Sequence, residues 1–258
     1  MSTVNDMQGR VALVTGGSDG IGLATAMLLA ERGATVAVCG RNPERLARAL
    51  AQLQGLGPAE AHQLDVADAV AFAALVEDVA RRHGRLDMLV NNAFSNSYAS
   101  VADLGLEQWR RDFSVNAEAV FVGTKAALAV MMAQGRGSIV NIASTNGIRA
   151  AAGMSSYSAS KAALLHFTAC AAMEAAPAGV RINTVAPGMV MTAAVEDYMR
   201  HFGDLAVRTV QAIPMQRAAQ PRELAEAIVF LLSDAASFIT GIALPVDGGK
   251  SVQLHLPG

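Results

Sequence analysis

Short runs of β-branched residues alternate with longer stretches of helical periodicity along the whole chain. Val11–Thr15 predicts a first strand and Ile21–Arg32 a first helix, and the alternation continues to the end of the sequence. The further strands are expected at Thr35–Cys39, His62–Asp65, Leu86–Asn91, Ser138–Ile142, Arg181–Val185 and Ala243–Val246. The further helices are expected at Pro43–Gln54, Asp68–Arg82, Leu106–Met132, Ser156–Ala175 and Arg222–Leu232. This order, seven strands with six helices, is typical of an α/β fold with a parallel sheet flanked by helices on both faces.

The same alternation fits two architectures, an open doubly wound sheet and a closed βα barrel. We expect one domain over residues 1–258, because no linker, repeat or charge block interrupts the pattern. Two stretches lie outside the rhythm, Ala93–Gly105 and Pro187–Gln220. In an open sheet both leave from strand carboxyl ends, where ligands bind. They are candidate substrate walls, and residues 189–219 are expected to form a lobe that covers the substrate.

Composition narrows the class of protein. Hydrophobic residues make up 52% and charged residues 16% of the chain, which suits a sheet buried on both faces. A net charge of −2 with scattered basic residues argues against a nucleic-acid partner. Charged residues interrupt the apolar stretches well before the ~20 residues of a membrane span, and the start lacks a signal-peptide core. We therefore expect a cytoplasmic protein that makes no membrane contact.

The metal-binding residue types show no ligand spacing. Cys39 and Cys170 lie far apart in the sequence and are expected to be small buried residues. The five histidines form no H-E-x-x-H pattern. The sequence predicts no metal site.

The turn after the first predicted strand carries the first chemical signal. The segment Thr15–Gly22 reads TGGSDGIG and leads directly into a helix. Glycines there permit a tight turn and a close approach of the backbone to a pyrophosphate, and the helix N-terminus attracts phosphate. The spacing differs from the common G-x-G-x-x-G fingerprint, so a plain glycine-rich turn stays the alternative. A dinucleotide site at this turn favours the doubly wound, Rossmann-type fold over the barrel.

The end of the second predicted strand bears on the choice of dinucleotide. An acid at this place would bind the adenosine ribose, whereas an arginine would accept a 2′-phosphate. The strand ends in Gly40 and Arg41, which favours NADP(H), unless Arg41 is a solvated residue paired with Glu44. Asp65 either accepts a hydrogen bond from the adenine amino group or caps the helix that begins near Asp68.

Tyr157 and Lys161 lie four residues apart, on one face of a predicted helix. An unperturbed tyrosine has a pKa of ~10 and is a poor base at neutral pH. A lysine ammonium at ~4 Å, in an effective dielectric of ~20, stabilises a phenolate by about 4 kcal/mol. That brings Tyr157 towards neutral pH, where general acid/base groups work best. The alternative is an exposed helical pair without a function.

Other polar residues give this pair a context. Ser144 follows the strand Ser138–Ile142, where its hydroxyl could hold a substrate oxygen. Asn116 lies inside a long predicted helix, which it could bend, or where it could hold a water. Asn91-Asn92-Ala93 closes the fourth strand and could fix loop backbone beside the dinucleotide, although such a segment is more often a turn.

These motifs, in this order, resemble those of the short-chain dehydrogenase/reductase family over nearly the whole chain. They are Thr15–Gly22, Asp65, Asn91-Asn92-Ala93, Asn116, Ser144, Tyr157, Lys161, Pro187-Gly188 with Thr192, and Val246–Gly249. The resemblance implies an enzyme that moves a hydride between a nicotinamide cofactor and a ketone or secondary alcohol. It also implies a homotetramer built through the helices that contain Asn116 and Tyr157.

The resemblance further implies a role for each residue. Tyr157 would exchange a proton with the substrate oxygen, and Ser144 would orient that oxygen. Lys161 would lower the pKa of Tyr157 and bind the nicotinamide ribose, and Asn116 would complete a proton relay. Residues expected at the cofactor are Gly16, Ser18, Asp19, Gly20, Ile21, Gly22, Arg41, Asp65, Val66, Asn92, Ala93, Tyr157, Lys161, Pro187, Gly188, Val190 and Thr192, the last two at the nicotinamide carboxamide. Residues expected at the substrate are Ser144, Tyr157, Phe94, Met154 and Met189.

Two residues depart from the family pattern. Phe94 stands where the family ordinarily has glycine after the fourth strand, and we expect its ring to project towards the nicotinamide pocket. Asp19 places a negative charge beside the phosphate turn, which counts against a phosphorylated ribose.

The main hypothesis is an NADP(H)-dependent reductase or dehydrogenase of a hydrophobic ketone, cyclic alcohol or steroid-like compound. Three alternatives stay open. They are an NAD-preferring alcohol dehydrogenase, a non-catalytic nucleotide-binding sensor, and an isomerase or dehydratase that uses the hydride internally.

Overall fold

The computed structural model describes residues 6–253, and its seven parallel strands form one sheet in the order β3-β2-β1-β4-β5-β6-β7. The single-domain prediction also included residues 1–5 and 254–258, which lie outside the described range, as do the side chains at positions 194, 198, 202, 204, 205 and 206. The sheet is open, with β3 and β7 at its edges, so the doubly wound, Rossmann-type prediction is confirmed and the barrel is excluded. The strands are β1 (Val11–Thr15), β2 (Thr35–Gly40), β3 (Ala59–Gln63), β4 (Met88–Asn91), β5 (Gly137–Ile142), β6 (Val180–Pro187) and β7 (Ala243–Val246).

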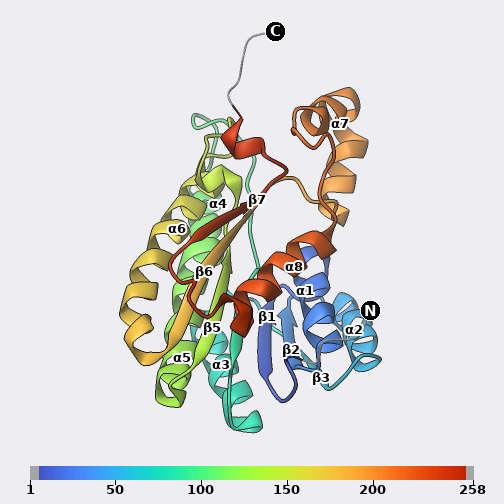
Figure 1. Cartoon of the computed structure of the whole chain (residues 1–258). Coiled ribbons are helices and arrows are strands. Elements are labelled where there is room, and N and C mark those ends of the chain that lie inside the picture. Colours follow the sequence, from blue (N-terminus) through green and yellow to red (C-terminus); the bar gives the residue numbers. More distant parts are fainter. Residues whose placement is uncertain (1–5, 254–258) are drawn as a thin grey trace.

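Helices cover both faces of this sheet (Figure 1). One face packs against α1, α2 and α8, and the other against α3, α5 and α6. The central strands are buried on both faces, as their continuous apolar runs predict. The α-helices are α1 (Gly20–Glu31), α2 (Pro43–Gln54), α3 (Ala69–His83), α4 (Leu106–Phe113), α5 (Ala119–Gln134), α6 (Ser155–Ala175), α7 (Ala193–Gln211) and α8 (Pro221–Leu232). Short helical turns are η1 (Ser114–Glu118), η2 (Thr145–Gly147), η3 (Ala176–Ala178), η4 (Asp234–Ala236) and η5 (Lys250–Val252).

Local signals fix several of these boundaries. The Asn42 side chain accepts a hydrogen bond from the Arg45 amide at 2.8 Å, and Pro43 occupies the first turn of α2. Asp68 caps α3 in the same way, through the Ala71 amide at 3.0 Å. The predicted α2 and the observed α2 therefore coincide, and it is Asp68 rather than Asp65 that caps α3.

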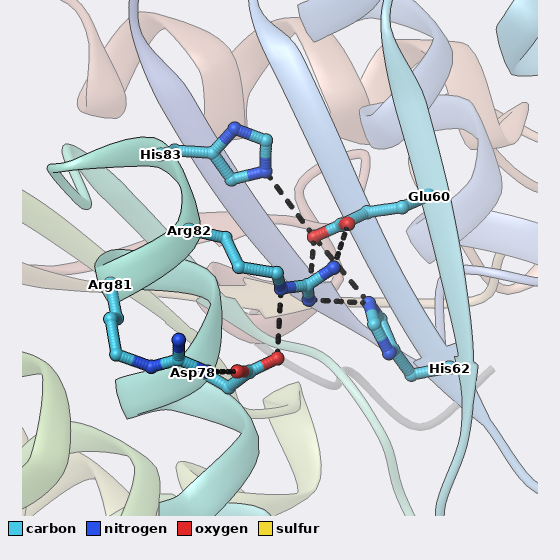
Figure 2. A network of polar contacts seen from close by, with 6 residues as sticks. All are labelled: Glu60, His62, Asp78, Arg81, Arg82 and His83. Carbon is cyan, nitrogen blue, oxygen red and sulfur yellow. Dashed lines mark hydrogen bonds and ion pairs between the residues drawn. The ribbon is translucent and has the colours of Figure 1, made fainter.

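The edge strand β3 begins earlier than predicted, at Ala59 instead of His62. Its sequence AEAHQ lacks β-branched residues, and it is only half buried, so the strand signal is weak. Figure 2 shows how the strand is held: Glu60 accepts two hydrogen bonds from Arg82 of α3, and the Nε2 atoms of His62 and His83 lie 3.4 Å from Glu60 Oε1. Charged side chains of this kind also protect an exposed sheet edge from pairing with another chain.

The helical run from Leu106 to Gln134 is not a uniform α-helix. It contains a π-turn, η1, in which the Ala119 amide bonds to the Ser114 carbonyl. Asn116 lies within this turn, so the predicted irregularity at this asparagine is confirmed. By length and composition alone the run could cross a membrane, with a mean hydropathy of 1.3 over its most apolar window, but half of that window is buried inside the protein. Burial of this kind is typical of the core helix of a folded domain.

The second stretch outside the predicted rhythm contains a helix that the sequence analysis did not predict. α7 spans Ala193–Gln211, with a break at Gly203, whose φ is 43°. In Figure 1 it stands apart from the layered body, beyond one end of the sheet. The cysteine prediction is half right, because Cys39 is buried in β2 whereas Cys170 on α6 is exposed.

Candidate active site

A cleft of about 880 Å³ follows the carboxyl ends of the strands. The segments after six strands, β1 to β6, line it, so residues far apart in the sequence meet there. We call its two parts the outer end, with Asp19, Arg41, Arg45, Asp65 and Arg111, and the inner end, with Ser144, Tyr157 and Lys161. The glycine turn after β1 lines the same cleft as the residues of both ends.

The glycine turn forms a cradle that side chains would fill. A Cβ atom at Gly22 would lie 2.3 Å from the Gly16 carbonyl oxygen, and Gly20 has a φ of +53°. The Asn92 side chain donates to the carbonyls of Thr15 and Gly16 at 2.9 and 3.2 Å, so it fixes this backbone as predicted. A backbone held open in this way, at the start of a helix, fits the pyrophosphate of a dinucleotide.

The first of two ion pairs at the outer end involves Asp19. Asp19 caps α1 through the Gly20 amide at 2.7 Å, and its second oxygen lies 3.1 Å from Arg45. Arg45 thus offsets the negative charge that counted against a phosphorylated ribose. Arg41 lines the cleft, and no ion pair joins it to Glu44 within residues 6–253, so the alternative of an Arg41–Glu44 pair finds no support.

Asp65 meets a partner that the sequence did not indicate. Its carboxylate accepts from Arg111 of α4 at 2.8 Å and from the Ala67 amide at 3.1 Å. Burial opposes the ionised form, but the Arg111 guanidinium and the Ala67 amide hold the pKa of Asp65 below its usual value. Val66 beside it is buried and also lines the cleft.

The segment after β6 closes the cleft from the other side. Thr192 packs over the glycine turn, since a Cβ atom at Gly20 would lie 3.0 Å from Thr192 Cγ2. Gly188 leaves room for Asp247, whose carboxylate accepts from the amides of Gly249 and Ser251. Other lining residues from this segment and the start of α7 are Pro187, Val190, Ala193, Val195 and Asp197.

Tyr157, Ser144 and Lys161 meet at the inner end. The Ser144 hydroxyl lies close enough to the Tyr157 phenol to lower its pKa. Lys161 is 2% exposed, its Nζ donates to the Ile142 carbonyl at 2.7 Å, and it lies 5.8 Å from the centre of the Tyr157 ring. The predicted grouping of these three residues around one point of the cleft therefore holds.

Burial dominates the acid/base properties of this end. It raises the pKa of Tyr157, while the nearby Ser144 hydroxyl lowers it and the charge of Asp112 raises it further. Burial also lowers the pKa of Lys161 to about 7. Because Lys161 bonds a carbonyl and is itself partly neutral near pH 7, the expected fall in the pKa of Tyr157 is not produced by the protein groups alone.

Asn116 is fully buried and its side chain is occupied by protein partners. Its Oδ1 accepts from the Ser95 amide at 2.9 Å, and its Nδ2 donates to the Ser95 carbonyl and to Ser160 Oγ. Ser160 Oγ in turn donates to the Tyr157 carbonyl at 2.7 Å. Asn116 therefore clamps the loop after β4 to the helix that carries Tyr157, and its place in a proton relay stays a prediction.

Of the three apolar substrate candidates, one lines the cleft. Phe94 is 56% exposed and lines the cleft, and it avoids the positive φ that a glycine would permit. Met154 and Met189 do not line this cleft, and their contact with the substrate stays a prediction. The Met154 sulfur accepts from Asn146 at 3.2 Å, and the Met189 carbonyl is held by the Ala219 amide at 2.9 Å.

Three charged residues near the cleft escaped the sequence analysis. Arg45 and Arg111 belong to helices that the sequence placed correctly, but only the tertiary fold turns them towards the cleft. Asp112 is fully buried on α4. Its position four residues before Asn116, on the same helix face, is the signal that could have found it.

Comparisons with known proteins identify the family to which the chain belongs. Residues 16–251 match the family model described as Enoyl-(Acyl carrier protein) reductase. The chain is 38% identical to a cyclopentanol dehydrogenase of Comamonas testosteroni, over 98% of this chain and 100% of that one. It is 42% identical to a cis-4-hydroxycyclohexanecarboxylate dehydrogenase of Sinomonas cyclohexanicum, over 93% of this chain and 96% of that one. The structure of an NAD⁺-bound xylitol dehydrogenase superposes with a TM-score of 0.89 at 33% identity, covering 94% and 99% of the two chains.

Proposed function

Since the chain belongs to the short-chain dehydrogenase/reductase family, we propose that it oxidises a small cyclic secondary alcohol, or reduces the matching ketone, with NADP(H). The wider activity, nicotinamide-dependent oxidoreduction of an alcohol or ketone, is that of its relatives. The observation that carries the proposal is the meeting of Tyr157, Ser144 and Lys161 at the inner end of one cleft.

Each of these residues has a distinct task. The nicotinamide ring, when bound, supplies or accepts the hydride at the substrate carbon. Tyr157 gives a proton to the substrate oxygen during reduction and takes it back during oxidation. Ser144, which lines the cleft beside the phenol, would hold the same oxygen in line with it. Lys161, set behind Tyr157 by its bond to the Ile142 carbonyl, is positioned to bind the nicotinamide ribose.

Phe94 and the relatives support the cyclic substrate. The aromatic side chain stands on the cleft wall with more than half of its surface exposed, so it offers a flat apolar face to a ring. Two relatives are named for cyclopentanol and for a hydroxycyclohexane carboxylate. A hydrophobic ring that packs on Phe94 would bring its hydroxyl towards Tyr157.

The cofactor preference rests on the outer end. β2 ends in Gly40 without an acid, and Arg41 and Arg45 both line the cleft there. Two guanidinium groups suit the extra phosphate of NADP(H). NAD(H) stays the alternative cofactor, because the similar xylitol dehydrogenase structure contains NAD⁺.

The quaternary structure and the location of the protein are part of the same proposal. The helices α5 and α6 expose Phe121, Met132 and Met173, which would be covered if further copies packed there. The family resemblance implies a homotetramer, and this surface would form contacts in it. The composition implies a location in the cytoplasm. Analytical ultracentrifugation gives the number of copies directly.

The test replaces Tyr157 with Phe and follows cofactor absorbance with cyclopentanol and cyclohexanol, using NADP⁺ and NAD⁺ in parallel. Turnover is expected to fall roughly thousandfold, because a positioned acid/base contributes between 10² and 10⁴. Tyr98→Phe is the matched control, since Tyr98 is exposed and does not line the cleft. If wild type and Y157F bind the cofactor but are equally inert, the sensor alternative gains. Product without a net change of absorbance would indicate an isomerase or dehydratase.

A further inference from the structure

Asp112 is a fully buried acid with no ion pair within the described part of the chain. An isolated carboxylate away from water is costly, so it has to be compensated by hydrogen bonds. Three donors supply them: Ser95 Oγ at 2.7 Å, the Ser97 amide at 3.0 Å and Ser156 Oγ at 2.6 Å. The carboxylate thus accepts its hydrogen bonds from neutral donors, and no ion pair within residues 6–253 offsets its charge.

The donors come from two separate parts of the site. Ser95 and Ser97 belong to the loop after β4, in which they follow Phe94 on the cleft wall. Ser156 belongs to the first turn of α6 and precedes Tyr157 directly. Asp112 therefore joins the predicted substrate wall to the helix that carries the acid/base residue.

Asn116, one helical turn further on, makes a second join between the same two parts. It holds both backbone groups of Ser95 and reaches Tyr157 through Ser160. The two clamps differ in one respect, because Asn116 is neutral and Asp112 is charged. Of these two residues, Asp112 alone can act on Tyr157 through its charge as well as through its hydrogen bonds.

The charged groups around Tyr157 are few. Lys161 lies on the same helix, with its Nζ 5.8 Å from the ring centre. The loops after β4 and β5 contribute the uncharged Phe94 and Ser144 to the cleft that Tyr157 also lines. Asp112 on α4 is the acid whose charge raises the pKa of Tyr157. The other charged residues that line the cleft are Asp19, Arg41, Arg45, Asp65, Arg111 and, from α7, Asp197.

We propose that Asp112 is a positioning residue that fixes the Phe94–Ser97 loop on the catalytic helix and whose negative charge opposes the phenolate of Tyr157. This charge favours the protonated phenol, which is the form that gives a proton to a carbonyl oxygen. The inference rests on the proposed role of Tyr157 as the acid/base.

Asp112→Asn separates charge from shape. The amide oxygen can still accept from the Ser97 amide and Ser156 Oγ, and the amide nitrogen can donate to Ser95 Oγ, whose hydroxyl is free to rotate. Asp103→Asn is the matched control, because Asp103 is an exposed acid between β4 and α4. Asp112→Ser, neutral and smaller, serves as the second variant if D112N does not fold.

The primary measurement is the ultraviolet titration of tyrosinate, with each protein compared with its own Y157F counterpart so that only Tyr157 contributes. The Tyr157 midpoint is expected at lower pH in D112N than in wild type, and unchanged in D103N. In kinetics, the rise of alcohol oxidation with pH and the fall of ketone reduction should both move to lower pH. A purely structural role would lower both rates without moving either midpoint.

Asp112→Ala tests the positioning half. It removes the acceptor for the Ser97 amide and for Ser156, so the loop loses its attachment to α6. Turnover is expected to fall roughly a hundredfold with a raised KM, since small misplacements at a reacting centre cost about that much. An unmoved Tyr157 midpoint in D112N, or unchanged kinetics in D112A, overturns the inference. Because the titration needs no turnover, an inactive wild type would refute the proposed function while this test still gave its answer.

Discussion

The two ends of the cleft use charge in opposite ways. At the outer end, Asp19 pairs with Arg45 and Asp65 with Arg111, and all four side chains are more than a third exposed. At the inner end, Lys161 is 2% exposed and bonds a backbone carbonyl instead of a carboxylate. Opposite charges face each other in water at one end, whereas single charges are buried at the other.

This difference indicates that substitutions at the inner end change proton transfer, whereas substitutions at the outer end change the affinity for the ligand. Exposed ion pairs contribute up to about 1 kcal/mol, because water and salt screen them. A buried group is unscreened, so its protonation state follows from burial itself. We therefore expect the inner end to respond to pH and the outer end to respond to the charge of the ligand.

The largest effect is expected from Lys161→Met at the inner end. Burial lowers the pKa of Lys161 to about 7 from 10.5, so between these values the unfolded chain binds more protons than the folded one. The folded state is therefore destabilised at pH 7, and this penalty is relieved as the pH rises. The free energy of unfolding of wild type should increase by roughly 2 kcal/mol more than that of K161M between pH 7 and pH 9.

Urea unfolding at the two pH values measures this difference. K161M also leaves the Ile142 carbonyl without its donor, but that loss does not depend on pH and cancels in the comparison. Parallel pH curves for the two proteins would show that Lys161 keeps an ordinary pKa, and the contrast between the two ends would disappear.

A smaller effect is expected from Arg41→Ala at the outer end. Loss of a charged hydrogen bond to the 2′-phosphate should raise the Kd for NADP⁺ roughly tenfold, with little change for NAD⁺. Isothermal titration calorimetry with both dinucleotides measures the ratio. Arg48→Ala is the matched control, since Arg48 is an exposed arginine on α2 that does not line the cleft. Equal losses for the two dinucleotides would favour an NAD-preferring enzyme.

The smallest effect is expected from Glu60→Gln, which calibrates an ion-pair cluster far from any ligand. Glu60 accepts from Arg82 and lies near His62 and His83, in the network of Figure 2. Its removal should cost about 1 kcal/mol of stability, less at high salt. Thermal unfolding at two salt concentrations measures the cost, with the exposed Glu77→Gln of α3 as control. A loss several times larger would mean that exposed pairs here, including those of the outer end, matter more than screening allows.

Sequence reasoning placed the elements whose signals are local. β1, α2 and β7 have the predicted bounds, because a continuous apolar run or a proline after a capping asparagine marks them. The bounds predicted for β3 were wrong, because an edge strand held by charged side chains has no apolar run to reveal it. α7 was missed because the segment after Pro187 departs from the regular alternation of strand and helix, and its helix is broken at Gly203.

The same distinction between local and long-range signals applies to the residues of the site. Ser144, Tyr157 and Lys161 were predicted together because their spacing and order form a recognisable pattern, and the structure brings them to one place. Arg111 and Asp112 could not be predicted from pattern. Their partners, Asp65 and Ser156, lie 46 and 44 residues away along the chain. Such contacts depend on how α4 is oriented over the sheet, which no local signal encodes.

The π-turn Ser114–Glu118 has a consequence for comparing homologous enzymes. It lies between Asp112, which faces the loop after β4, and α5, which packs on the sheet. Since each residue of a helix advances the chain by about 100° around its axis, removing one residue here would turn one of these surfaces away from its partner. Chain length across this turn, more than the identity of any residue in it, is what relatives with the same inner end must share. A one-residue gap at this place in an alignment would mark a protein whose proton-transfer machinery is assembled differently.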